Sequence, residues 1–414
     1  MSQPVRILLA LIAGLAVGIL LSRVGPSAAQ TGILVAQPIG TAWLNALQMT
    51  VIPLVVSLLI TGIASTTEAA NAGRLAGRTI GYALIMLAVN AAISAMLTPL
   101  ILNTVPIPGA AAQALRAALA GVPPVATPPS PGEIFAAIVP SNAFAAAAGG
   151  ALLSLIVFTL VFAFALTRID GEGRTLLVRM FAAIRDTMLV VVGWVLWLAP
   201  LGVFSLAYLV GARAGSAAFG ALVHYLAVIS TIGIVVTLTA YLFAALGSRA
   251  GLGRFTRASL PAQAFAVSTQ SSLATLPTML KAAGEMGIPT AASGVTLPLG
   301  VAMVRMTQPA MNVAIALYIG RWFGVEVPVA AVALGVLTGV VTSLGSISLP
   351  SQLTFFASVA PISSAMGTPL APLGLLIAVE TIPDIFRTLG NVTSNLALTA
   401  VATRDQTVPE AQTD

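Results

Sequence analysis

The sequence predicts an all-α membrane protein with eight transmembrane helices and two re-entrant helical hairpins arranged as inverted repeats. Of its 414 residues, 58% are hydrophobic and 7% are charged, too few polar side chains to cover a soluble domain of this size. Several apolar runs reach the ~20 residues that a bilayer requires and lack the alternation of a barrel strand. Two further segments carry hydroxyl-rich centres that do not suit a helix in lipid, and these predict the hairpins.

The apolar runs that precede residue 250 predict the first transmembrane spans. They are 7–21, 39–65, 79–102, 133–166, 187–210 and 217–246. Pro53 predicts a kink in the second span, and Gly149 and Gly150 divide the fourth into a small-residue helix and a bulkier one. Residues 26–29 resemble a signal-peptidase site, but we expect the preceding run to be retained as the first span.

The placement of positive charge predicts the orientation in the membrane. Arginines cluster in alternate short loops, which the positive-inside rule places in the cytoplasm. They are Arg74, Arg78, Arg168, Arg174, Arg179, Arg185, Arg249, Arg254 and Arg257. The Pro- and Ala-rich stretch 103–132 carries one charge, Arg116, and is predicted as an external loop. We therefore attribute the net charge of +6 to orientation in a bacterial-type inner membrane, and expect no nucleic-acid partner.

Two segments of similar pattern predict hairpins that enter the membrane and turn back. In the first, residues 254–282, hydroxyl side chains centre on Ser271 and Ser272, and a Leu-Pro step follows. In the second, residues 329–362, serines precede the same step at Pro350. Paired interrupted segments in the two halves of a chain indicate an inverted-repeat transporter with a site at the membrane midplane. Free backbone amides at the two tips would donate hydrogen bonds to an anion.

The predicted last span, residues 375–400, carries ionisable groups within an apolar run. One face of a helix would hold Glu380, Asp384, Arg387, Thr388, Asn391 and Asn395. A charge at the centre of a bilayer costs at least ~2.5 kcal/mol, so this stripe predicts a substrate or ion site. The alternative is a self-satisfied pair of Asp384 and Arg387 that only holds helices together.

Catalytic chemistry finds little support in the composition. The chain has no cysteine, which excludes disulfides, thiolate nucleophiles and cysteine-based metal sites. Its one histidine, His224, lies in an apolar run without a neighbouring carboxylate, and we interpret it as structural rather than as a proton relay. The serine-rich tips lack a nearby base, so we expect no enzymatic activity, no cofactor and no metal site.

Several motifs spread along the chain carry a family resemblance. They are LNALQMTVIPLVVSLLITGIAS, VPSNAFAAAAGGALLSLIVF, LAPLGVFSLA, STQSSLATLPTML, LPLG, SLGSISLPS and DIFRTLGNVTSN. With these motifs the chain resembles the dicarboxylate/amino acid:cation symporter family, the glutamate and aspartate transporters and their bacterial homologues. The resemblance covers nearly the whole length.

The resemblance implies a homotrimer whose subunits each have a scaffold and a mobile transport domain. The transport domain would carry the site across the membrane by an elevator motion. The implied scaffold comprises residues 1–78 and 133–216, the implied transport domain comprises residues 79–102 and 217–402, and residues 403–414 form a cytoplasmic tail. The second hairpin would be the external gate, with tip residues Ser346, Ser348 and Pro350.

The resemblance also implies roles in substrate binding. Arg387 would bind a side-chain carboxylate and Asp384 an α-amino group, with Thr388 and Asn391 assisting. The tip serines of the first hairpin would hold the α-carboxylate. Physically, an arginine can bind a carboxylate through two parallel hydrogen bonds, and Asp384 would discriminate amino acids from plain diacids.

The motif of the predicted seventh span departs from the family. Where the family has Asn-Met-Asp-Gly-Thr after Pro-Leu-Gly, this chain has Val-Arg-Met-Thr-Gln at residues 304–308. Asn395 stands where an aspartate usually binds sodium. Because Na⁺ needs oxygen ligands and a guanidinium repels it, we expect sodium coupling to be absent, reduced, or replaced by proton coupling through Glu380 or Asp384.

Arg305, within this motif, has two interpretations. As a tethered cation, it would neutralise the substrate or Asp384 where sodium would otherwise lie. As a structural residue, it would pair with Glu380 or with backbone carbonyls and hold the unwound helix, with Pro309 keeping the break.

The sequence thus predicts a secondary active transporter of acidic amino acids or C4-dicarboxylates. Acidic amino acids are the leading substrates, because the four family positions on the last helix are intact. The alternatives are an anion-conducting channel, an uncoupled carrier or exchanger of carboxylates, and a membrane receptor that binds a carboxylate without flux.

Overall fold

The computed structural model describes residues 3–71, 73–107, 109, 112–113, 139–214, 217–344 and 351–405. Within these residues the regular elements are α-helices, and one isolated antiparallel bridge pairs Val304 with Leu344. The prediction of an all-helical protein is therefore confirmed.

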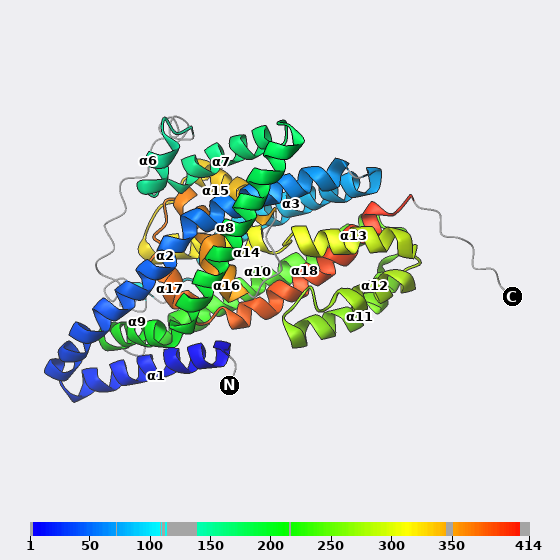
Figure 1. The fold of residues 1–414 in the computed structure, drawn as a ribbon. Coiled ribbons are helices and arrows are strands. Elements are labelled where there is room, and N and C mark those ends of the chain that lie inside the picture. Colours follow the sequence, from blue (N-terminus) through cyan, green and yellow to red (C-terminus); the bar gives the residue numbers. More distant parts are fainter. Residues whose placement is uncertain are drawn as a thin grey trace.

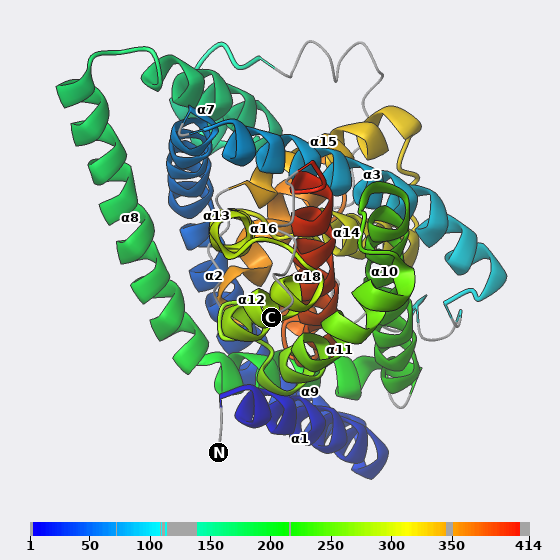
Figure 2. The ribbon, with the colours of Figure 1, turned by 90° about the vertical axis from the view of Figure 1, so that its right-hand side faces the viewer.

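One group of helices packs around the long helix α2. It comprises α1 (Gln3–Val24), α2 (Pro26–Asn71), α6 (Ala143–Ala148), α7 (Leu152–Leu166), α8 (Gly171–Trp197) and α9 (Ala199–Ala214). Figure 1 shows α1 beside α9, and the two approach closely because Gly14 and Gly18 face the backbone of α9. In Figure 2, α8 lies at the outer edge of the molecule, where it packs on α2.

A second group is centred on α18. It comprises α3 (Arg74–Thr104), α10 (Ala217–Gly247), α11 (Leu252–Thr269), α12 (Leu276–Glu285), α13 (Thr290–Met303), α14 (Gln308–Phe323), α15 (Val329–Ser343), α16 (Ser351–Ala365), α17 (Pro372–Leu376) and α18 (Thr381–Ala402). Of these helices, α18 packs on α3, α10, α11, α12, α13 and α16. Figure 2 shows α18 in red at the centre, with α10, α11 and α13 packed around it. The polar stripe of the last span is thus enclosed by protein.

The lengths of the helices fit an integral membrane protein. Among the described residues, four segments are long and apolar enough to cross a bilayer alone: Val5–Val24, Ser27–Glu68, Arg74–Thr104 and Phe219–Gly247. A fifth forms if α8 and α9, which are bent by 55°, count as one span. The other apolar helices are shorter or broken, and the full arrangement of eight spans stays a prediction.

Two arginine-rich segments that were predicted as loops are helical. Helix α3 begins at Arg74 and includes Arg78, and α8 includes residues 171–186. Arginine, leucine and alanine are strong helix formers, and α8 meets no glycine or proline between Gly173 and Gly193. The arginines indicate on which side of the membrane these segments lie. Whether the segments are helical or irregular depends instead on the helix propensity of their residues.

The predicted fifth span is also interrupted. Helix α8 ends at Trp197 and α9 begins at Ala199, with Pro200 in its first turn. Proline is tolerated in the first turn of a helix but cannot continue the ladder of the preceding one, which accounts for the break. The predicted division of the fourth span at Gly149 and Gly150 is confirmed, since α6 and α7 flank these residues.

Both predicted hairpin segments form pairs of packed helices. Helices α11 and α12 contact each other and are joined by a turn that begins at Gln270, whose φ of 51° is left-handed. Helices α15 and α16 contact each other in the same way. The predicted gate residues Ser346, Ser348 and Pro350 lie outside the described residues. How deeply the hairpins enter the bilayer stays a prediction.

Candidate functional site

The candidate site lies at the start of α18, where the predicted last span is broken. Helix α17 ends at Leu376, residues 377–380 form turns, and α18 begins at Thr381 with Glu380 as its N-cap residue. Pro383 in the first turn is compatible with the start of a helix but not with its interior. The break and Pro383 together fix where α18, the helix that carries the polar stripe, begins.

Arg387 is the centre of the polar contacts in this region. Its Nη2 atom lies 2.6 Å from Oε1 of Glu380, in an ion pair whose side chains are 4% and 0% exposed. Its Nη1 atom donates to Oδ1 of Asn312 on α14 at 3.1 Å. Asn312 in turn donates from Nδ2 to the hydroxyl of Ser358 on α16 at 3.0 Å. The guanidinium therefore joins the start of α18 to two other helices.

The partner of Arg387 differs from the one that the sequence suggested. The alternative prediction paired Arg387 with Asp384, whereas the structure gives it Glu380. Residues seven apart lie on the same face of a helix, two turns and about 10.5 Å of rise away. Glutamate and arginine have the longest acidic and basic side chains, so they can meet across this separation.

Part of the binding capacity of this pair is unused. Among the described residues, Nε of Arg387 and Oε2 of Glu380 have no hydrogen-bond partner. The hydroxyl of Tyr225 on α10 faces the carboxylate of Glu380 without a hydrogen bond of ordinary geometry. A guanidinium has five N–H donors, so Glu380 and Asn312 leave several of them for a further acceptor. The pair thus keeps hydrogen-bonding capacity that the described residues do not use.

The predicted seventh span is broken beside this cluster. Helix α13 ends at Met303, α14 begins at Gln308, and Pro309 in its first turn lacks the N–H that a continuous helix would use. The backbone N–H and the hydroxyl of Thr307 both donate to Oδ1 of Asn391, at 2.9 and 3.0 Å. Asn391 thus holds the unwound segment against α18.

The unwound segment also contacts the first helix of the second hairpin. Val304 forms an isolated antiparallel bridge with Leu344, the residue after α15. Nε2 of Gln308 donates to the carbonyl oxygen of Thr342 at 3.4 Å. Backbone and side-chain contacts therefore hold the break of the seventh span against the end of α15, the first helix of the second hairpin.

Arg305 lies in the break and is buried. Its positive charge interacts favourably with Asp384 and unfavourably with Arg387. Glu380, the partner that the structural interpretation gave to Arg305, is bonded to Arg387. The roles of Arg305 as a tethered cation beside Asp384 and as a structural residue held by backbone carbonyls both stay predictions.

The first hairpin reaches α18 through α11 rather than through its tip serines. Nε2 of Gln263 donates to the hydroxyl of Thr393 at 3.0 Å. At the tip, Oγ of Ser271 accepts from the backbone N–H of Ala274, and both Ser271 and Ser272 are half-buried. Among the described residues, neither serine is hydrogen-bonded to α18, so the two serines are not part of the cluster around Arg387. Their role in holding an α-carboxylate stays a prediction.

The remaining stripe residues, Thr388 and Asn395, are buried on α18. Neither polar side-chain atom of Asn395 has a hydrogen-bond partner among the described residues. A Cβ added at Gly300 of α13 would lie 2.3 Å from Oδ1 of Asn395, so the two helices are in close contact there. Within the described part of the chain, no group of three or more histidine or acidic residues could hold a metal ion.

Three residues of the cluster were not singled out from the sequence. They are Asn312, Tyr225 and Ser358, and each comes from a different helix. Asn312 could have been found, because it is a polar residue inside the apolar run 295–318. Tyr225 and Ser358 carried no such signal, since their approach to the site depends on helix packing.

Comparisons with known proteins agree with the resemblance noted in the sequence. The chain matches the sodium:dicarboxylate symporter family over residues 4–405. It is 28% identical to the proton/sodium-glutamate symport protein of Bacillus subtilis, covering 88% of this chain and 84% of that protein. It is 27% identical to the proton/glutamate-aspartate symporter of Escherichia coli, covering 96% and 91%. It is 24% identical to the C4-dicarboxylate transport protein of Leptothrix cholodnii, covering 94% and 86%.

We expect Arg387→Ala to destabilise the protein, because it leaves Glu380 as an unpaired carboxylate in a dry interior. Removing one partner of a buried ion pair costs ~3–5 kcal/mol. Adding Glu380→Gln removes the second charge, so the double variant should regain most of the lost stability. Thermal unfolding of the purified protein in detergent measures both effects. Equal midpoints for the single and the double variant would contradict the pairing.

Proposed function

The chain belongs to the sodium:dicarboxylate symporter family, and we propose that it is a secondary active transporter of acidic amino acids or C4-dicarboxylates across a bacterial-type inner membrane. The observation that carries this proposal is the buried guanidinium of Arg387, which has unused N–H donors next to a carboxylate. A guanidinium is suited to carboxylates because its donors match both oxygens. The names of the bacterial relatives support the same substrates.

In this proposal the carboxylate of Glu380 pairs with Arg387 whenever no substrate carboxylate is bound. In the unloaded site it neutralises Arg387 at 2.6 Å, so no isolated charge crosses the membrane when the empty carrier returns. A substrate carboxylate that takes over the guanidinium leaves Glu380 buried without its partner. A buried unpaired carboxylate is costly, so Glu380 binds a proton at this step. Proton symport follows from this exchange.

The surroundings of Asp384 bear on the choice between the two substrate classes. The charge of Arg305 interacts favourably with that of Asp384. In this proposal Arg305 takes the place of the ammonium group that an amino acid would present to Asp384. A diacid has no ammonium group and needs none if Arg305 takes its place. This interaction favours C4-dicarboxylates over the amino acids that the intact last-helix motif suggests.

The carrier works in this proposal as an elevator. The group of α1, α2 and α6 to α9 is the scaffold, and the group around α18, which includes both hairpins, is the moving transport domain. The contacts support this division, because the most extensive ones lie within each group. The subunits assemble as homotrimers, with the second hairpin as the external gate.

Uptake into proteoliposomes tests this function. We expect saturable uptake of aspartate or succinate that responds to a proton gradient and is unchanged when sodium is replaced by choline, because residues 304 and 306 offer no oxygen side chains for sodium. Strict dependence on sodium would contradict the proposed coupling. Current without saturable flux would indicate a channel instead.

Loss of carboxylate binding is expected in the Arg387→Ala/Glu380→Gln double variant. Truncating one member of a buried charge pair costs ~2–5 kcal/mol, which corresponds to roughly 30-fold to a few thousand-fold in affinity. Calorimetric titration with aspartate and succinate measures the change. Glu380→Gln alone is the matched control and should keep or improve affinity. Unchanged affinity in the double variant would show that substrate binds elsewhere.

We expect Arg305→Gln to change the substrate preference. Without the guanidinium, Asp384 needs a positive charge from the substrate. The uptake efficiency of aspartate should therefore rise relative to that of succinate. The measurement is the ratio of the two uptake efficiencies in the same vesicles, with the wild type as reference. An unchanged ratio would contradict the role of Arg305 in selecting the substrate.

A further inference from the structure

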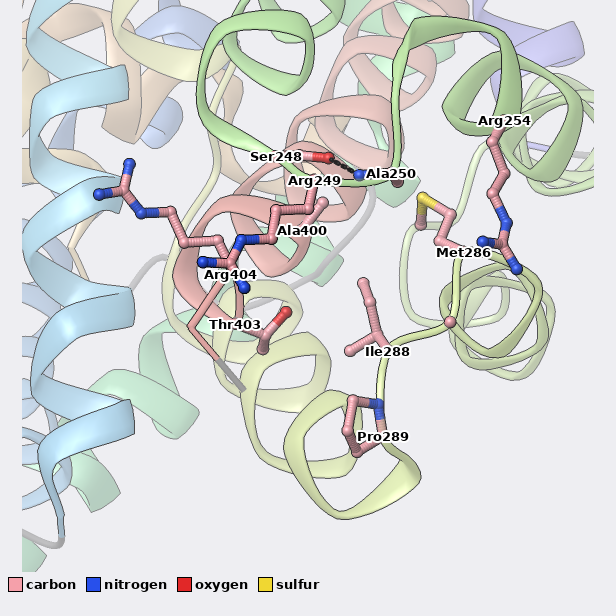
Figure 3. A pocket seen from close by; sticks show the side chains of 11 residues that line it. Ser248, Arg249, Ala250, Arg254, Met286, Ile288, Pro289, Ala400, Thr403 and Arg404 are labelled. Carbon is pink, nitrogen blue, oxygen red and sulfur yellow. Dashed lines mark hydrogen bonds between the residues drawn. The ribbon is translucent and has the colours of Figure 1, made fainter. Parts of the chain in front are cut away.

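A second polar site lies at the end of the molecule where α10 and α18 finish. A cavity of about 330 Å³ opens there between the α10–α11 connection, the α12–α13 connection and the end of α18 (Figure 3). Its lining includes Arg249, Arg254 and Arg404. It shares no residue with the cluster around Arg387.

Three arginines from different segments supply the charge of this cavity. In Figure 3, Arg249 and Arg404 lie on one side of Ile288, and Arg254 lies on the other side, beyond Met286. Nε of Arg254 donates to the backbone carbonyl of Glu285 at 2.8 Å, which fixes the side chain and leaves its Nη groups for another acceptor. Nε of Arg404 lies 3.5 Å from Oδ1 of Asp405, a long contact.

Among the described residues no acidic side chain lines the cavity, and Asp405, next to Arg404, is shared among several arginines. Asp405 lies 2.7 Å from Nη1 of Arg78 on α3 and also interacts with Arg404 and Arg249. Desolvation alone would raise the pKa of Asp405, but the hydrogen bond and charge of Arg78, with the charges of the other two arginines, hold it below its usual value. The local potential is therefore positive.

The shape of the cavity fits a phosphate with an apolar attachment. One wall is apolar, formed by Met286, Ile288, Pro289 and Ala400. Helix α13 begins directly after Pro289, and the start of a helix favours an anion. The volume exceeds that of a bare phosphate. The site also lies at the ends of two helices that cross the predicted membrane region, the level at which headgroups are found.

We propose that this cavity binds a phosphate-bearing anion through Arg249, Arg254 and Arg404. Arginine binds phosphate through parallel hydrogen bonds, and basic pockets between membrane helices on the cytoplasmic side bind anionic headgroups. The source favoured by the apolar wall is phosphatidylglycerol or a related anionic lipid of the cytoplasmic leaflet. A soluble phosphate ester shares the same chemistry.

Native mass spectrometry of the delipidated full-length protein tests this proposal. Dioleoyl phosphatidylglycerol should bind the wild type at about tenfold lower concentration or better than dioleoyl phosphatidylcholine. Arg249→Gln/Arg254→Gln should lose this preference. The matched control is Arg168→Gln/Arg179→Gln, which neutralises two exposed arginines outside the cavity and should keep it. Arg249→Gln alone is measured in parallel, so that misfolding of the double variant still leaves a comparison.

Soluble probes distinguish the two sources of phosphate. Inorganic phosphate and glycerol 3-phosphate are added separately while the thermal midpoint is recorded. A rise in the wild type that is absent in Arg249→Gln/Arg254→Gln would support the site and assign it to a soluble phosphate. The proposal is overturned if the wild type prefers neither the anionic lipid nor a phosphate. It is also overturned if the cavity variant retains the preference that the wild type shows.

Discussion

Arg387 and Glu380 meet at 2.6 Å in the interior of a protein whose outer surface faces lipid. Neither charge would be stable there alone, because each loses its hydration and gains no substitute from an apolar surrounding. The pair resolves this by mutual neutralisation, and Asn312 adds a hydrogen bond that connects α14 and, through Ser358, α16. One guanidinium therefore connects three helices.

For the proposed function, the same pair would make a binding site that is stable and still open to a ligand. If the ion pair used every donor and acceptor, it would be only a structural lock. Instead Nε of Arg387 and Oε2 of Glu380 lack partners within the described part of the chain. In the proposed function, a ligand carboxylate takes over a contact that the protein already makes, and the free energy of binding is the difference between two similar interactions.

Unwound backbone in a membrane protein needs partners, because no water is present to satisfy its polar groups. The break at residues 304–307 has them: Asn391 accepts from Thr307, and Val304 pairs with Leu344. Close approach of α18 to this break requires a glycine, since a Cβ at Gly390 would lie 2.5 Å from the side chain of Thr307. Tertiary contacts thus hold the break in place, and the same contacts bring the polar stripe of α18 next to the unwound segment.

The sequence by itself determined the helical class of fold, the breaks at residues 149–150 and 304–307, and the polar face of α18, but not the breaks before α9 and α18. Composition and apolar runs require helices in a bilayer, and a period of 3.6 puts Asp384, Arg387 and Asn391 on one side without any knowledge of packing. Arginine clusters indicated a side of the membrane but misled on conformation, because α8 continues through residues 171–186. Only the tertiary structure decided which groups pair. The choice of Glu380 for Arg387 and of Asn391 for Thr307 depends on how two broken helices meet, and contacts between distant segments leave no periodic trace in a sequence.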